Sequence, residues 1–128
     1  MLFRSQSMTM HHVAGTGENG YTGDGGVAQL AKFGGSPGSP AAARLAGPKG
    51  LALGSDNSLY IVDTESHAIR KVDLATGVIS TVLGTGALGD GPEANPLTCR
   101  LNRPHAALFV NGVLYVADSE AHRIRVLK

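Results

Sequence analysis

Short apolar runs separated by clusters of glycine, serine, aspartate and asparagine dominate the chain from residue 50 onward. The runs cover residues 50–53, 59–62, 69–72, 78–83, 106–110, 113–117 and 123–127. Such clusters between apolar runs are typical of turns between antiparallel strands, and Asn111-Gly112 strongly favours a two-residue hairpin. Because 59–62 and 114–117 are nearly continuous apolar runs, we expect both faces of the sheets to be covered. The pattern predicts an all-β chain.

This strand pattern occurs twice. Residues 59–72 match residues 114–127 at seven of fourteen positions, at a constant shift of 55. Further upstream, the glycine-rich stretch 13–26 matches part of 82–91 at a larger shift, so the first copy carries an insertion between Gly26 and Arg44. Four short strands in a repeat of this length predict a propeller blade.

The residues of the first copy carry a family resemblance. Pro48-Lys49-Gly50-Leu51-Ala52-Leu53, followed by residues 59–72, resembles the NHL repeat, which builds β-propellers that commonly have six blades. The glycine-rich stretch 15–26 is similar to the connectors of NHL arrays, and the resemblance covers residues 13–128. It implies an NHL-type β-propeller segment of four-stranded antiparallel blades, with two blades' worth of strands. Two features depart from the pattern: the long insertion around 27–43, and the absence of glycine after Pro104.

The strand count divides the chain into six segments. We expect an N-terminal tail (1–8), an outer strand that closes a last blade (9–17), a Gly/Pro/Ser-rich connector (18–44), blade 1 (45–86), a second connector (87–100) and the three strands of blade 2 (101–128). Two blades cannot close a ring and leave apolar faces in water. We therefore expect either a homo-oligomer, in which three chains close six blades and each N-terminal strand completes a neighbour's last blade, or a longer propeller of which this chain is part.

Composition narrows the function classes. The 18 glycines, 6 prolines and only 16% charged residues argue against a helical bundle. A formal net charge of +1 leaves no strong electrostatic signal for nucleic acid, so an RNA-binding NHL module is only a further alternative. The chain shows no secretory signal and no apolar run long enough to span a membrane, and the compartment is not indicated.

Two repeated residue pairs are the main chemical candidates. Asp63 and His67 return as Asp118 and His122. A carboxylate beside an imidazole suits acid–base catalysis or metal binding, but repetition with every blade favours a structural role in which the carboxylate binds backbone N–H groups. The long connectors are expected at the same end as these turns, so these four residues, with Arg44 and Arg100, are the candidates for a ligand-binding face.

Other motifs favour structure over chemistry. Gly15-Thr16-Gly17-Glu18-Asn19-Gly20 fits a dinucleotide fingerprint without the required helix. Asp24 and Asp90 are expected to form turns, since one carboxylate per loop is too few for Ca²⁺. The pair His11-His12 alternates across a strand and suits no shared metal, and Cys99 with His105 lacks a third catalytic member. The repeated arginines Arg70 and Arg125 are expected to pair with Glu65, Asp73 or Glu120.

The sequence favours a non-catalytic binding or interaction scaffold, with no cofactor and no catalytic or metal residue assigned. The alternative is part of a metal-dependent lactonase- or lyase-like propeller enzyme, as the resemblance allows. Such enzymes hold their metal with non-repeating acidic, amide or imidazole ligands at the axial end, and residues 50–53 and 106–110 carry none.

Overall fold

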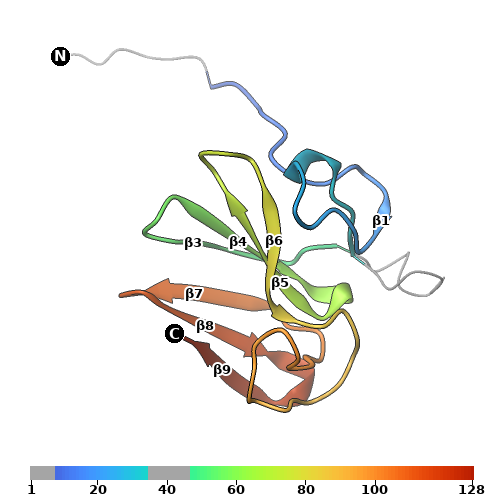
Figure 1. The fold of residues 1–128 in the computed structure, drawn as a ribbon, viewed down its shortest axis with the longest axis vertical. Helices are drawn as coiled ribbons and strands as arrows, with labels where there is room; N and C mark the ends of the chain where they lie inside the picture. Colours follow the sequence, from blue (N-terminus) through green and yellow to red (C-terminus); the bar gives the residue numbers. More distant parts are fainter. Residues whose placement is uncertain (1–7, 35–46) are drawn as a thin grey trace.

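Short strands and single 3-10 turns make up the regular structure of the computed structural model, which describes residues 8–34 and 47–128. The strands are β1 (Asn19–Gly20), β2 (Phe33–Gly34), β3 (Gly50–Leu53), β4 (Ser58–Asp63), β5 (Ala68–Asp73), β6 (Ile79–Gly84), β7 (Ala106–Val110), β8 (Val113–Asp118) and β9 (Arg123–Leu127), and the turns are η1 (Ala28–Leu30), η2 (Thr64–Ser66) and η3 (Ser119–Ala121). Strands β3–β6 form a four-stranded antiparallel sheet and β7–β9 a three-stranded one, which confirms the all-β blade architecture (Figure 1).

Both sheets begin with the same register. In blade 1, Tyr60 pairs with Ala52 and Lys71; in blade 2, Tyr115 pairs with Leu108 and Val126. The hairpin between β7 and β8 has positive φ at both Asn111 and Gly112, as the dipeptide predicts. Within the described residues, no helix is long and apolar enough to span a membrane.

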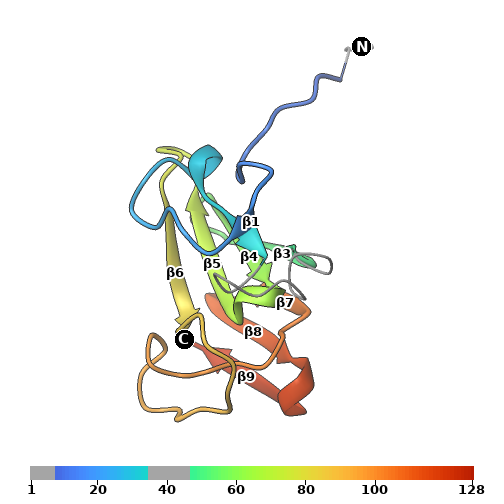
Figure 2. The same cartoon turned by 90° about the vertical axis from the view of Figure 1, so that its right-hand side faces the viewer.

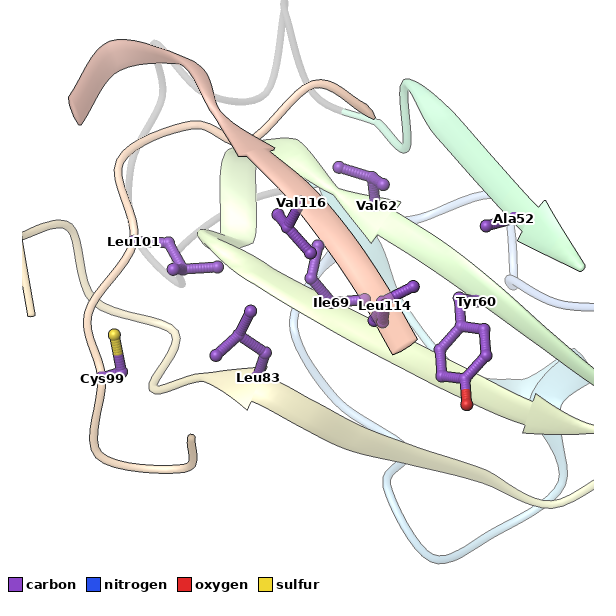
Figure 3. Close-up of a cluster of buried hydrophobic side chains, with 9 residues drawn as sticks. All are labelled: Ala52, Tyr60, Val62, Ile69, Leu83, Cys99, Leu101, Leu114 and Val116. Atoms are coloured by element: carbon purple, nitrogen blue, oxygen red, sulfur yellow. The ribbon is translucent and has the colours of Figure 1, made fainter. Parts of the chain in front are cut away.

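The main core lies between the two sheets. Tyr60, Val62 and Ile69 of blade 1 pack against Leu114 and Val116 of blade 2 (Figure 3). The cluster also contains Ala52, Leu83, Cys99 and Leu101. The rings of Tyr60 and Phe109 stack with centroids 5.4 Å apart. Backbones approach so closely at Gly50 that an added Cβ would lie 2.8 Å from the His105 carbonyl oxygen. Blade 1 is therefore covered on one face by blade 2.

A second core covers the other face of blade 1. Ala28, Ala31 and Phe33 of the first connector pack on Ile61 and Val72. The connector also forms a strand-like ladder along β6, because the Gly25 N–H donates to the Ile79 carbonyl at 2.6 Å and the Ile79 N–H donates to the Gly26 carbonyl at 3.0 Å. The insertion therefore contributes Ala28, Ala31 and Phe33 to this second core.

Residues 9–17, expected as an outer strand, are not a strand in the single chain. A strand requires a neighbouring edge for its backbone hydrogen bonds, and the edge of β9 lies at the opposite end of the molecule in both views (Figures 1 and 2). Ala14 packs on the second core and the Gly15 N–H donates to the Ala28 carbonyl at 2.9 Å. The closing of another blade by this segment stays a prediction.

Candidate functional site

The repeated aspartates are buried and each pairs with an arginine of its own blade. Arg125 Nε donates to Asp118 Oδ2 at 2.8 Å, and Arg70 Nη1 lies 3.5 Å from Asp63 Oδ2. Asp118 Oδ1 also accepts the Asn102 N–H at 2.7 Å, which is the backbone contact expected for a carboxylate at this turn. Both carboxylates have no exposed surface, and their contacts are to groups at the ends of the blades.

The aspartates of the glycine loops complete the same networks. Arg70 Nη2 donates to Asp24 Oδ1 at 3.0 Å, and Arg123 Nε donates to Asp90 Oδ1 at 2.9 Å. Hydrogen bonds from Arg123 and then Arg125 hold the pKa of Asp90 below its usual range. These carboxylates therefore fasten the connectors to the blades.

The partners expected for the two buried arginines were wrong. Arg70 binds Asp63 and Asp24, and Arg125 binds Asp118, Asp90 and Glu93. The guanidinium of Arg70 also lies between the rings of Tyr21 and Phe33, at 4.9 and 4.7 Å from their centroids. Asp63 and Asp118 end the strand next to each arginine, and the other acidic partners come from the connectors, which fold back over the sheets.

The turn η2 forms a polar seam between the two blades. Thr64 Oγ1 donates to the Pro104 carbonyl at 2.7 Å, and the Arg103 N–H donates to His67 Nδ1 at 3.1 Å. Arg103 also binds Glu65 through two nitrogens, at 2.7 and 3.1 Å. Burial lowers the pKa of His67, so the neutral imidazole acts as an acceptor for the next blade.

The predicted ligand-face residues do not converge on one site. Asp63, His67 and Asp118 serve the packing just described, whereas His122 and Arg100 are exposed. Arg44 lies outside the described residues. Within 8–34 and 47–128, no group of three or more His, Cys, Asp or Glu side chains is arranged to hold a metal ion.

One of the apolar faces that the strand count leaves uncovered is the outward face of blade 2, which we call the open face. It consists of Ala106, Leu108, Val110, Tyr115, Ala117, Ile124 and Val126, which alternate along β7, β8 and β9. Tyr115 is 42% exposed and Ile124 69% exposed, whereas their repeat equivalents Tyr60 and Ile69 are 7% and 0% exposed beneath blade 2. Uncovered apolar faces are expected from the strand count without their residues being assigned, and the period-two alternation of the strands is the signal that could have assigned them.

Blade 1 presents a matching apolar surface on its opposite side. Leu51 and Leu53 are 64% and 68% exposed, and they are the repeat equivalents of Ala107 and Phe109, which pack on blade 1. A hollow of about 340 Å³, lined by Ala14, Gly15, Phe33, Gly47 and Pro48 among others, lies where the first connector meets the segment before β3. Each end of the two-blade unit thus exposes one half of the interface that the centre forms.

The sequence of the chain matches two family models of NHL repeats. The family model described as Teneurin NHL domain matches residues 3–104, and the NHL repeat model matches residues 101–127. Protein SUPPRESSOR OF QUENCHING 1, chloroplastic, of Arabidopsis thaliana is 35% identical over 77% of this chain and 9% of its own length. Teneurin-3 of Danio rerio is 41% identical over 68% of this chain and 3% of its own length.

A solved structure shows the same arrangement of strands. A structural genomics protein of unknown function from Bacteroides thetaiotaomicron superposes with a TM-score of 0.70 and 25% identity, covering 89% of this chain and 26% of that one. The chain therefore spans about a quarter of this structural neighbour and a tenth or less of the two curated relatives.

Proposed function

Because the chain belongs to the NHL-repeat family of β-propellers, we propose that it is a non-catalytic interaction scaffold whose open face binds the outer face of blade 1 in a second copy. Three copies joined in this way supply six blades, the number common in NHL propellers. The observation that carries the proposal is the internal interface, because blade 1 already uses the equivalent of the open face to bind blade 2.

The apolar residues at the two ends support this pairing. In the internal interface, Tyr60 stacks on Phe109. In the proposed interface, Tyr115 takes the place of Tyr60 and Leu53 of the second copy takes the place of Phe109. Burying exposed apolar side chains contributes about 25 cal/mol per Å². An aromatic ring placed on an aliphatic side chain retains most of that contribution.

The polar seam has matching parts as well. Ser119 and His122 stand where Thr64 and His67 stand, and both histidines have a left-handed backbone, with φ of 58° and 53°. In the second copy, the Gly47 N–H and the Pro48 carbonyl are the equivalents of the groups that His67 and Thr64 bind. The hollow beside Gly47 and Pro48 would receive the η3 turn.

Two positions make the proposed interface weaker than the internal one. Gly47 replaces Arg103, so Glu120 would gain no arginine from the second copy. Ala106 replaces Gly50, at which an added Cβ would lie 2.8 Å from a backbone oxygen. The proposed interface is therefore slightly wider near β7 and separable by dilution.

The substitution Tyr115→Asp tests the proposal. It places a charge at the centre of the open face, so we expect association to weaken by at least about 30-fold, as for the loss of a central contact worth about 2 kcal/mol. Sedimentation velocity across a dilution series gives the dissociation constants. Leu74→Asp is the control, because Leu74 is exposed in the β5–β6 turn.

The results of this experiment distinguish a loss of association from a loss of folding. Circular dichroism should show a native fold for both variants, since both side chains are exposed in the single chain. An oligomer that survives Tyr115→Asp unchanged would contradict the use of the open face. A wild-type monomer at every concentration would contradict self-association and indicate blades from a different chain.

A further inference from the structure

The two glycine-rich connectors begin with the same turn, formed by residues 15–17 in the first and 84–86 in the second. The last glycine of each turn, Gly17 or Gly86, has a φ of 89°, and the first glycines have φ of 95° and 105°. In each turn the threonine hydroxyl accepts the N–H of the residue two positions later, at 3.1 Å. We call them the first and second Gly-Thr-Gly turns.

An aromatic ring lies on the second Gly-Thr-Gly turn. A Cβ added at Gly86 would lie 2.6 Å from Cε2 and 2.9 Å from Cδ2 of Tyr21, so the ring rests directly on the glycine. The ring is also held by Arg70, whose guanidinium lies 4.9 Å from its centroid, and its hydroxyl binds Thr81 Oγ1 at 2.8 Å. A turn with this backbone is therefore a surface on which an aromatic side chain packs, and glycine allows the close approach.

The first Gly-Thr-Gly turn has the same backbone with no ring on it. In the described part of the chain, a Cβ added at Gly17 would meet no atom within 4 Å beyond its chain neighbours. The turn forms one side of the hollow of about 340 Å³, whose apolar walls include Ala14, Phe33 and Pro48. Phe33 lies against the turn, since a Cβ added at Gly15 would be 3.4 Å from its Cδ2. The free space thus borders both a glycine backbone and an aromatic ring.

The proposed self-association would bring no ring to this space. When Gly23-Asp24-Gly25 is aligned with Gly89-Asp90-Gly91, Ala87 stands at the position of Tyr21. An alanine methyl cannot cover Gly17 as the tyrosine ring covers Gly86. The free space on Gly17 therefore does not depend on the proposed function.

We propose that the first Gly-Thr-Gly turn binds an aromatic side chain of a separate polypeptide, with the ring on Gly17 and beside Phe33. Aromatic pairs pack edge-to-face or offset and contribute more than their buried area alone. The hollow lies near the lower end of the range of about 300–1,000 Å³ found for ligand pockets, which suits one side chain better than an extended cofactor. Thr16, Glu18 and Asn19 line the same hollow and offer polar groups to the backbone that carries the ring.

Titration with a small aromatic probe tests the proposal. The probe is N-acetyltyrosinamide, added to the full chain carrying Tyr115→Asp so that self-association does not compete, and amide NMR spectra report the residues affected. We expect saturable shifts of residues 15–18 and of Phe33. N-acetylleucinamide, which has no ring, should bind at least about fivefold more weakly, because it lacks the aromatic contact with Phe33.

A substitution at Gly17 identifies the binding surface. Gly17→Asn keeps a residue that tolerates positive φ and places a side chain where the ring would lie, so binding of the tyrosine probe should weaken at least about tenfold, as for the loss of a main contact. Gly25→Asn is the matched control, because Gly25 has a φ of 85°, also has open space at its Cβ position and does not line the hollow. It should bind the probe as the parent does, and circular dichroism checks that both variants are folded.

The results decide the proposal independently of the oligomeric state. Saturable shifts at the turn that Gly17→Asn removes and Gly25→Asn keeps support the aromatic site. Equal binding of the leucine probe, equal binding by Gly17→Asn, or no saturable shift at residues 15–18 overturns it. If Gly17→Asn does not fold, the shifts of the chain that retains Gly17 decide whether the ring binds at the turn. None of these results alters the proposed self-association, which sedimentation of the chain with Tyr115 measures separately.

Discussion

The residues that matter most for the blade ends are two buried arginines. Each arginine binds two aspartates, one at the end of the preceding strand and one in a glycine-rich connector. These are Asp63 and Asp24 for Arg70, and Asp118 and Asp90 for Arg125. Buried guanidinium groups need such partners because an unpaired charge in the interior is costly. The repeated Asp and Arg positions thus join connector and blade into one unit, twice in the described chain.

Replacing Asp118 tests this role. We expect Asp118→Asn to lower the free energy of unfolding by about 3 kcal/mol, because Asp118 is the fully buried carboxylate that binds Arg125 and its loss leaves the buried guanidinium with two partly exposed ones, Asp90 and Glu93. Glu93→Gln is the matched control, since Glu93 binds the same arginine but its side chain is 72% exposed, and it should cost about 0.5 kcal/mol or less. Urea unfolding measures both. Equal losses for the two variants would contradict the structural role of Asp118.

At the scale of the elements, side chains of the turn η2 and of His67, which follows it, bind blade 1 to the segment that enters blade 2. They offer a hydroxyl, a carboxylate and an imidazole to the strand entering the next blade. The imidazole must be neutral to accept the Arg103 N–H. Stability of the interface therefore depends on pH through His67.

The direction of the pH dependence follows from the lowered pKa of His67. Burial keeps this pKa below the usual 6.5, so the unfolded chain binds the proton more tightly and stability falls as the pH drops below about 6.5. We expect His67→Asn to remove part of this loss, because asparagine tolerates the left-handed backbone and does not titrate. Urea unfolding between pH 5 and 8, in the Tyr115→Asp background, measures the difference.

His122→Asn is the control for this experiment. It makes the same change at the repeat-equivalent turn, where the imidazole is exposed in the single chain. Its pH profile should match that of the parent. A His67→Asn profile identical to that of the parent would show that His67 does not titrate across the folding transition.

The positions of the strands and turns could be predicted from the sequence, but the side-chain contacts between distant segments could not. The hairpin at Asn111-Gly112 and the strand runs follow from local chemistry, which fixes φ and the alternation of side chains. The partners of Arg70 could not be predicted, because Asp24 is 46 residues away and reaches it only once the connector folds over the sheet. The outer strand expected over residues 9–17 is not formed in the described chain, which places no strand edge beside this segment.

At the scale of the whole molecule, the two blades share one apolar interface, and the outer face of each blade repeats one side of that interface. The open face repeats the surface that blade 1 buries, and Leu51 and Leu53 repeat the positions that blade 2 buries. Such an arrangement is heterologous, so it either closes into a ring or continues as a filament. Under the proposed self-association, two blades per chain and six blades per ring would give closure at three copies.

Sedimentation equilibrium of the wild-type chain tests this account most directly. The account predicts a species with the mass of three chains, in equilibrium with the monomer at low concentration because Gly47 and Ala106 weaken the second interface. A folded species with the mass of one chain at every concentration, or one that stops at two chains, would contradict it.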